Sequence, residues 1–584
     1  MTGYTPDSRL GDVLENPAAR SVLSNALPGL VNSPMLGQLR NMSLRMLADH
    51  ETALRDDPER SAAFWASLAA IEDTTPPRAE APAIAPDPDY EGEEVPRGSA
   101  ELTVPTDARV HGPVEIALRG PSHGNPFVDV ELEARVEGPT SSLRVGGFYD
   151  GDGRYLLRFL PEEPGTWRLV TSSTARSLDG IKGSLEVSAE PAGPGAVRVA
   201  DRFHFAHADG TRHVPLGTTA YAWTHQGQEV QERTLAALAS SPFTKIRMCV
   251  FPKAYLYNTE DPERFPFPRA EDGEGFDLTR FDLEYFRHLE SRIRDLDALG
   301  IQADLILFHP YDRWGFAELG RAADDRYVRY LVRRLAALPN VWWSMANEFD
   351  LMWTKAEEDW ERLAAIVVAE DPSRHLLSIH NCLRFYDYSR PWITHSSTQR
   401  IDVYRTAENV TEWREQWGKP VVVDECAYEG DLDQGWGNIT GEEMTRRFWE
   451  GAVRGGYVGH GETYFREDHE IWWSKGGDLH GTSPDRIAFL ARILAEAPGG
   501  VLEPLPSEWD TPWAGVAGEH LLLYFGFNRP RFRTVRLPEG RRYTVDVLDT
   551  WGMTIERLPE TVEGSATIPL PARQFMALRF IAVP

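Results

Sequence analysis

The first 72 residues carry apolar side chains at helical spacing. The recurring positions are Leu10, Val13, Leu14, Leu23, Leu27, Leu39, Met42 and Met46. Steps of three and four within each group are typical of amphipathic helices, so residues 1–72 are predicted to form a small helical module. The following stretch, residues 73–99, is rich in proline and acidic residues and has no hydrophobic period. It is therefore predicted to be a linker.

Apolar and polar residues alternate in two other parts of the chain. Residues 100–195 contain the runs "VEIALRG", "FVDVELEARVEG" and "RYLLRFLP", with turn residues between them. The same rhythm returns over residues 500–584 in "HLLLYFGFN" and "YTVDVLDTW". A period of two in short runs is typical of half-buried strands, so each part is predicted to be a β-sandwich. The first also resembles an immunoglobulin-like domain.

Residues 196–499 instead alternate strand, loop and helix. Eight apolar runs are predicted strands: "HVPLGTTAYAW", "FTKIRMCVFP", "QADLILFHP", "VWWSMANE", "LLSIHN", "WITHSST", "PVVVDECAYEG" and "GGYVGHGETYF". Helical runs separate several of them, and one begins with Thr440 and Glu443 in the spacing of a capping box. Eight strands alternating with helices predict a (β/α)8 barrel. The fold class is thus a multidomain α/β protein, with a central TIM barrel between two β-sandwiches and a helical module in front.

Charge and cysteine content exclude several classes of partner. The chain has 61 Lys and Arg against 89 Asp and Glu, a formal net charge of -28, so nucleic acid and anionic membrane surfaces are not expected partners. Three widely spaced cysteines predict neither a disulfide framework nor a metal site. The start of the sequence lacks the basic and apolar regions of a signal peptide, and no apolar run is long enough to span a membrane. We therefore expect a soluble, cytoplasmic protein.

Polar and aromatic residues gather where the predicted barrel strands end. In a barrel of this kind the active site lies at the carboxyl ends of the strands. The residues at these ends are Tyr221, Trp223, His225, Arg247, His309, Tyr311, Asp312, Asn347, Glu348, His380, Asn381, His395, Glu425, His460 and Glu462. Carboxylates inside otherwise apolar segments need partners, which a purely structural rim would not require. This pattern predicts an active site.

Glu348 and Glu425 are the predicted catalytic pair. They follow the fourth and seventh strands, whose ends lie across the barrel mouth from each other. Two facing carboxylates suit the hydrolysis of a glycosidic bond, where one protonates the leaving oxygen and the other supports or attacks the reacting carbon. Asn347 is expected to donate a hydrogen bond to a neighbouring sugar hydroxyl. Arg247 is expected to keep Glu425 ionised through its charge.

Other rim residues are predicted to bind substrate or to position Glu425. His395 or Tyr464 is expected to hold the Glu425 carboxylate, and strand alternation is expected to turn Asp424 to the opposite side of its strand. The complete set of predicted substrate-binding residues is Asn347, Arg247, His309, Asp312, His380, His395, His460, Glu462, Tyr464, Trp223 and Trp436. No cofactor and no metal is expected.

These residues carry a family resemblance. Asn347 and Glu348 after the fourth strand, Glu425 after the seventh and Arg247 in the second resemble glycoside hydrolase clan A, and the barrel is similar to the apiosidase-like group of glycosidases. The resemblance implies that Glu348 is the acid/base and Glu425 the nucleophile. One departure is that clan A enzymes usually carry a Trp at the end of the eighth strand, whereas this strand reads "YVGHGETYF". No residue is then assigned as the surface on which the sugar ring packs, and Glu462 is a second candidate for the nucleophile.

The sequence as a whole predicts a retaining, exo-acting glycoside hydrolase that acts by double displacement on short oligosaccharides or glycosides. One alternative is a carbohydrate-binding protein on an inactive barrel. Another is a metal-dependent amidohydrolase, which would need an H-x-H motif in the first strand that "PLGTTAYAW" lacks. The helical opening resembles an accessory module of other bacterial glycosidases and is predicted to mediate homo-oligomers. The only other expected partner is a small carbohydrate substrate.

Overall fold

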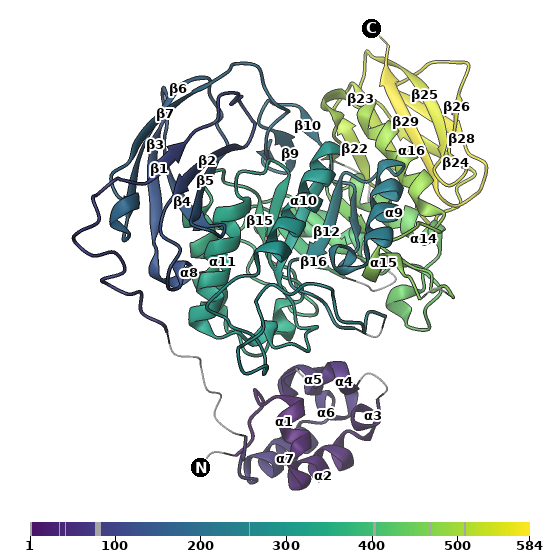
Figure 1. Cartoon of the computed structure of the whole chain (residues 1–584). Helices are drawn as coiled ribbons and strands as arrows, with labels where there is room; N and C mark the ends of the chain where they lie inside the picture. Colours follow the sequence, from purple (N-terminus) through teal and green to yellow (C-terminus); the bar gives the residue numbers. More distant parts are fainter. Residues whose placement is uncertain are drawn as a thin grey trace.

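The structure is a computed structural model that describes residues 3–33, 36–40, 42–75, 83–255, 257–400, 405–467, 469–506 and 510–583. Figure 1 shows a central barrel, a β-rich region to its left, a second β-rich region at the upper right and a helical module below. The expected multidomain α/β architecture with β-rich flanks is therefore present. None of the described helices is long and apolar enough to cross a membrane.

Eight parallel strands form the barrel, in the spatial order β15-β14-β13-β12-β11-β19-β17-β16. They are β11 (Gly217–Thr219), β12 (Lys245–Cys249), β13 (Gln302–Phe308), β14 (Val341–Ala346), β15 (Leu377–Ser378), β16 (Ser396–Gln399), β17 (Val421–Glu425) and β19 (Tyr457–His460). Seven of these strands lie inside their predicted runs, and β16 extends one residue past "WITHSST", to Gln399. A bridge between His380 and Ser397 joins the two ends of the order, so the barrel is nearly closed.

Helices surround the barrel between the strands. They are α9 (Gln228–Ala239), α10 (Leu283–Ala298), α11 (Arg321–Leu335), α12 (Glu357–Glu370), α13 (Val410–Trp417), α14 (Gly441–Ala452) and α16 (Ser483–Ala495). The predicted start of α14 is correct, because the Thr440 hydroxyl accepts the N–H of Glu443 at 3.2 Å. The Glu443 carboxylate instead binds Arg446 and Arg447. Because Glu443 pairs with these two arginines, its carboxylate does not complete the capping box with the backbone N–H of Thr440.

A three-stranded sheet closes the end of the barrel where the strands begin. It consists of β8 (Val197–Ala200), β9 (His204–His207) and β10 (Arg212–His213). Phe205 of this sheet is fully buried, with ring centroids 5.2 Å from Trp342 and 5.4 Å from Tyr457. Both partners lie near the starts of their strands, so apolar packing seals the end of the barrel opposite to the predicted site.

The first β-rich region is an antiparallel sheet in the order β1-β2-β5-β4-β3-β6-β7. Its strands are β1 (Glu101–Thr103), β2 (Val114–Arg119), β3 (Leu132–Glu137), β4 (Ser142–Tyr149), β5 (Arg154–Phe159), β6 (Gly165–Ser173) and β7 (Lys182–Val187). The first half of β4, up to Gly146, pairs with β3, and the second half, from Gly147, pairs with β5. Apolar residues from both halves share one core. Arg158 binds Glu290 of α10 at 2.8 Å, which ties this region to the barrel.

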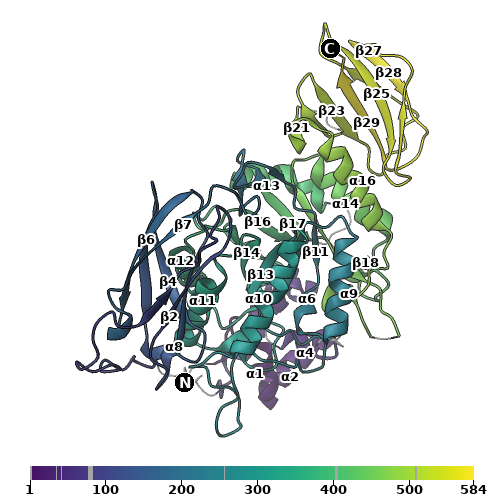
Figure 2. The same cartoon turned by 45° about the horizontal axis from the view of Figure 1, so that its top comes forward.

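The second β-rich region follows α16 and stands at the upper right in Figure 2. Its main sheet contains β21 (Glu503–Leu505), β22 (Trp513–Val516), β23 (His520–Tyr524), β29 (Met576–Ala582), β25 (Arg542–Asp549) and β26 (Thr554–Arg557), with β27 (Val562–Glu563) beside β25. A two-stranded sheet of β24 (Phe532–Arg536) and β28 (Ser565–Pro569) accompanies it. Tyr524 stacks on Trp449 of α14 at 5.4 Å. Aromatic packing therefore joins this region to the barrel.

The helical module contains α1 (Leu10–Glu15), α2 (Pro17–Ala26), α3 (Pro28–Val31), α4 (Leu36–Leu39), α5 (Leu44–His50), α6 (Thr52–Arg55) and α7 (Pro58–Ala69). The predicted apolar positions Leu10, Val13, Leu14, Leu23 and Leu27 are buried in its core. Leu351, which follows β14 of the barrel, joins the same core. The Arg9 guanidinium lies 3.6 Å from Glu318 and 4.8 Å from the Trp353 ring. The module thus contacts loops at the carboxyl end of the barrel, and its role in oligomerisation stays a prediction.

Replacing Phe205 by alanine is expected to destabilise the protein by about 3–5 kcal/mol, because it leaves a cavity under the barrel. Urea unfolding, followed by circular dichroism, measures the loss in free energy of unfolding. The matched control is Phe532→Ala, since Phe532 is 61% exposed and such a change costs less than about 0.5 kcal/mol. Equal stability of the two variants would contradict the packing described for β9.

Candidate active site

Glu348 and Glu425 face one cavity at the carboxyl end of the barrel. Glu348 directly follows Asn347 at the end of β14, and Glu425 is the last residue of β17. The cavity has a volume of about 410 Å³. Its walls are formed by Tyr255, Tyr311, Glu348, Cys382, Leu383, Phe385, Gln399, Arg400, Glu425, Ala427, Tyr428, Trp436 and Trp473.

Three groups hold the buried carboxylate of Glu425. Arg247 Nη1 donates to Glu425 Oε1 at 2.8 Å, the Tyr221 hydroxyl donates to the same oxygen, and His380 Nε2 lies 3.2 Å from it. Burial alone would raise the pKa of Glu425, but the charges of His380 and Arg247 hold it well below its usual range. Glu425 is therefore ionised at neutral pH.

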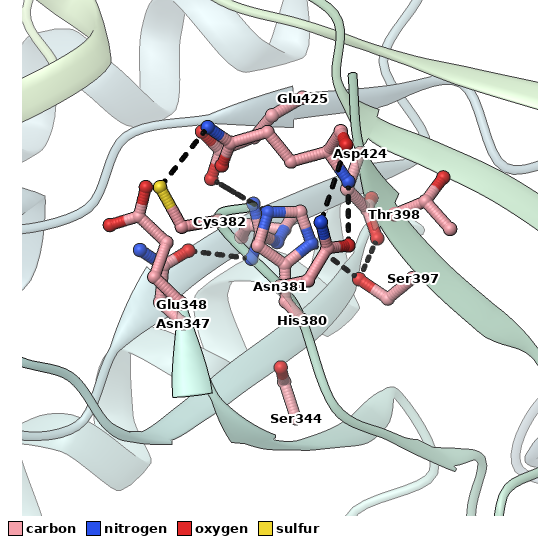
Figure 3. A network of polar contacts seen from close by, with 12 residues as sticks. Ser344, Asn347, Glu348, His380, Asn381, Cys382, Ser397, Thr398, Asp424 and Glu425 are labelled. Carbon is pink, nitrogen blue, oxygen red and sulfur yellow. Dashed lines mark hydrogen bonds and ion pairs between the residues drawn. The ribbon is translucent and has the colours of Figure 1, made fainter. Parts of the chain in front are cut away.

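A hydrogen-bonded chain runs from Glu425 into the barrel interior, as Figure 3 shows. His380 Nδ1 lies 3.0 Å from the Ser397 hydroxyl, which donates to Asp424 Oδ2 at 2.6 Å. Asp424 Oδ1 in turn accepts from the Lys245 ammonium at 2.7 Å. The His380 ring thus lies between the Glu425 carboxylate and the Ser397 hydroxyl.

Asp424 does not follow the predicted alternation. The ladder between β16 and β17 shifts at this point, from Thr398 opposite Val423 to Gln399 opposite Glu425. Asp424 consequently contacts Lys245 and Glu425 contacts Arg247, two cations on the same face of β12. The prediction that Asp424 points to the opposite side from Glu425 is wrong, because the bulge removes the alternation.

Glu348 lies in a different electrostatic environment. Its side chain accepts a hydrogen bond from the Tyr311 hydroxyl. Burial, and then the charge of Glu425, raise the pKa of Glu348 to about 7. Its backbone is left-handed, with φ 52° and ψ 55°, a conformation that is uncommon for a residue with a side chain. The same cavity therefore holds one protonated and one ionised carboxyl group at mildly acidic pH.

Gln399 lies between the two carboxyl groups. An amide oxygen facing two carboxylates would be repelled, so the amino group faces them. In that orientation the amide nitrogen is 3.2 Å from Glu348 Oε1 and 3.2 Å from Glu425 Oε2. The two oxygens can thus be no further apart than twice this distance. Gln399 donates to both catalytic candidates, a contact that the sequence did not indicate.

Asn347 is fixed by the same cation as Glu425. Its side-chain oxygen accepts from Arg247 Nη2 at 2.9 Å and lies 3.1 Å from the Tyr221 hydroxyl. The amide oxygen faces the guanidinium, and the amide N–H groups consequently point the other way. The structure therefore brings Asn347, Arg247, Glu348 and Glu425 together, and adds His380 to them.

Several predicted binding residues lie away from the cavity. His309 Nε2 is 3.1 Å from the carbonyl of Phe251, and the Asp312 carboxylate accepts the N–H groups of Trp314 and Ala317, so it shapes its own loop. His460 lies 3.0 Å from the Thr218 hydroxyl. Trp223 is fully buried in the main barrel core.

The two residues expected to position Glu425 have other neighbours. His395 precedes β16 at the opposite end of the barrel, where its ring packs against Trp342 at 5.2 Å. The Tyr464 hydroxyl donates to Glu429 at 3.3 Å. Glu462 accepts the backbone N–H of His480, and burial raises its pKa to about 8. His380, Arg247 and Tyr221 occupy the role that was assigned to His395 or Tyr464.

Aromatic residues from other segments form a wall of the cavity, whereas the eighth strand does not end in a Trp. Trp473 of α15 (Trp472–Lys475) lies 5.0 Å from the predicted wall residue Trp436. Tyr255, Tyr311 and Tyr428 complete this wall. Sequence reasoning placed Tyr311 at the rim but missed Trp473, because it comes after the eighth strand. The paired tryptophans in "IWWSK" were the available signal.

Comparison with known proteins agrees with this geometry. The family described as "Apiosidase-like, catalytic domain" matches residues 200–497. The chain belongs to this apiosidase-like family. The apiosidase-like chain is a glycoside hydrolase, and this membership does not favour the amidohydrolase and inactive-barrel alternatives. Two families described as domains of unknown function, DUF5060 and DUF5605, match residues 107–174 and 509–581.

Solved structures resemble the apiosidase-like chain as well. One, from Bacteroides vulgatus and described as a candidate glycoside hydrolase, is 36% identical with a TM-score of 0.77, and the match covers 82% of this chain and 100% of that one. A family 5 glycoside hydrolase from the same organism is 15% identical with a TM-score of 0.52, and covers 66% of this chain and 94% of its own length. This second likeness shows the barrel fold alone. No curated protein matches the chain.

Two substitutions are expected to move the pKa of Glu348 in opposite directions from about 7. Tyr311→Phe removes a hydrogen bond to the carboxylate and raises the pKa, whereas Glu425→Gln removes a like charge and lowers it. Carbon-13 NMR titration of the glutamate carboxyl groups measures both shifts, with Glu348→Gln identifying the signal. Identical midpoints in all three proteins would refute the described electrostatics.

Proposed function

We propose that this apiosidase-like enzyme is a retaining, exo-acting glycosidase in which Glu425 is the nucleophile and Glu348 the acid/base. The observation that carries this assignment is the different surroundings of two carboxyl groups in one cavity, since Arg247 and His380 contact Glu425 but not Glu348. These surroundings displace the two pKa values in opposite directions. A nucleophile must be ionised and an acid must be protonated at the working pH. Glu425 and Glu348 meet these two requirements respectively.

In the first step a Glu425 carboxylate oxygen attacks the anomeric carbon and forms a glycosyl ester. The bond from this carbon to the leaving oxygen breaks, and Glu348 gives its proton to that oxygen. Arg247 and His380 stabilise the carboxylate before attack, and Gln399 is close enough to contact both carboxyl groups. The Asn347 amide is available to donate to the neighbouring sugar hydroxyl.

In the second step Glu348, now ionised, accepts a proton from water. The water oxygen bonds to the anomeric carbon, and the ester bond to Glu425 breaks, which restores its carboxylate. Loss of the Glu425 charge in the intermediate removes one cause of the raised pKa of Glu348. The raised pKa therefore keeps Glu348 protonated for its role as the acid, and the lower pKa in the intermediate leaves it ionised for its role as the base.

The separation of the carboxyl groups supports retention of configuration. Inverting glycosidases keep their carboxyl groups roughly 6.5–9.5 Å apart to admit a water, whereas retaining enzymes keep roughly 5–5.5 Å. Gln399 lies 3.2 Å from an oxygen of each group. This limit on their distance favours the retaining geometry.

The size of the cavity supports a short substrate and exo action. Its volume of about 410 Å³ lies near the lower end of ligand sites. Trp436 and Trp473 provide ring faces suited to a sugar. Leu383 lines this cavity and also a neighbouring one that is bordered by Arg45 of the helical module. The helical module thus borders a cavity next to the active site.

Screening nitrophenyl α- and β-glycosides, both furanose and pyranose, tests the proposal. Glu425→Gln is expected to lose activity on every substrate. Glu348→Gln is expected to lose about 10²–10⁴-fold on sugars with poor leaving groups and less on nitrophenyl glycosides, which need little protonation. The matched control is Glu462→Gln, which should stay active. On the substrate found, kcat/KM should fall as pH rises through about 7, since Glu348 then loses its proton.

Proton NMR of the first sugar released settles the stereochemistry. Retention of the anomeric configuration agrees with double displacement at Glu425. A first product of inverted configuration would contradict it, as would full activity of Glu425→Gln.

A further inference from the structure

Lys253 is a buried cation that the proposed mechanism does not use. It follows β12 in the loop toward the active site, and its side chain is only 1% exposed. Its ammonium group lies 3.6 Å from the Tyr221 ring centroid, 4.5 Å from Tyr311 and 4.7 Å from Trp473. Burying a charge costs several kcal/mol unless it is compensated. The Lys253 ammonium group therefore needs compensating interactions.

Aromatic rings surround the ammonium group in place of carboxylates. Tyr255 adds a fourth ring, with its centroid 5.3 Å away. Among the residues that the structure describes, none forms an ion pair with Lys253. Ring faces attract a cation through their quadrupole, and the attraction is stronger in a desolvated site. The rings compensate the charge in part only, and burial lowers the pKa of Lys253 to about 8.

The two rings nearest to Lys253 are those that bind the catalytic carboxyl groups. The Tyr221 hydroxyl donates to Glu425, and the Tyr311 hydroxyl donates to Glu348. A cation over the face of a phenol withdraws electron density and makes its hydroxyl a stronger donor. One ammonium group is thus in contact with both hydrogen-bond donors. Lys253 is not among the residues that line the cavity, and its ammonium group contacts these two rings.

We infer that Lys253 is a positioning residue that couples the two catalytic carboxyl groups through Tyr221 and Tyr311. The cation fixes both rings and strengthens both of their hydrogen bonds. It thereby favours the ionised form of Glu425 and makes Glu348 a stronger acid than burial alone would allow. This inference rests on the proposed roles of Glu348 and Glu425.

The position of the loop agrees with this role. The carbonyl of Lys253 accepts from the Asn258 side chain at 2.6 Å, and the next residue, Ala254, donates its N–H to the carbonyl of Tyr311 at 2.9 Å. The backbone that carries the cation is therefore attached directly to one of the two tyrosines. A shift of the loop would move the Tyr311 donor with it.

The test compares Lys253→Met, which keeps the length without the charge, with Lys253→Arg, which keeps the charge. Carbon-13 NMR titration of the Glu348 carboxyl in the full chain needs no substrate. In Lys253→Met the pKa of Glu348 should rise, because a nearby positive charge is lost. Lys253→Arg should restore it in part. On an active substrate, kcat of Lys253→Met should fall about tenfold to hundredfold with little change in KM.

Lys355→Met is the matched control. Lys355 is also buried, lies 4.7 Å from the Phe308 ring and pairs with Asp324. It contacts neither tyrosine, so its removal should leave the pKa of Glu348 unchanged. A second check uses Tyr311→Phe as the background, where Lys253→Met should shift Glu348 less than in the wild type.

An unchanged pKa of Glu348 in folded Lys253→Met would overturn the inference, as would equal shifts in the two backgrounds. A general loss of folding would show in the near-ultraviolet circular dichroism of Lys253→Arg as well. Failure of the proposed function gives a different result, because no glycoside is then cleaved. The NMR titration still reports in that case whether Lys253 changes the pKa of Glu348.

Discussion

The interaction on which the active site depends is the repulsion between Glu348 and Glu425 in one buried cavity. Two carboxylates at this separation cannot both ionise without a large cost. Arg247 and His380 settle which of them carries the charge, because both contact Glu425 and so favour its ionised form. Glu348, which receives a hydrogen bond from Tyr311, keeps its proton to about pH 7.

The barrel makes this division possible by holding charges from several strands at fixed positions. Arg247 extends from β12 to Asn347 after β14 and to Glu425 on β17. Lys245, two residues earlier, pairs with Asp424, and Asp424 accepts a hydrogen bond from Ser397, which contacts His380. Arg247 and Lys245 are thus each paired with a carboxylate of β17. Removing any one of them would leave a buried charge uncompensated.

Strand periodicity was sufficient to predict the barrel and the Asn347–Glu348 and Glu425 positions. All eight predicted runs contain barrel strands, because long apolar segments between helices have few other solutions. The residues that hold Glu425 were harder to predict. The role of holding Glu425 was assigned to His395 or Tyr464, and His380 was predicted only to bind substrate, since sequence alone does not tell which end of a short strand a histidine occupies. The bulge at Asp424 and the position of Trp473 in the cavity wall depend on tertiary packing, which a local sequence pattern does not encode.

Neutron diffraction from crystals of the unliganded enzyme in deuterated solution tests this account most directly. At about pH 6, below the pKa of about 7 of Glu348, nuclear density should show a deuteron on Glu348 and none on Glu425. A deuteron on Glu425, or a bare Glu348, would contradict the assignment of the nucleophile and the acid.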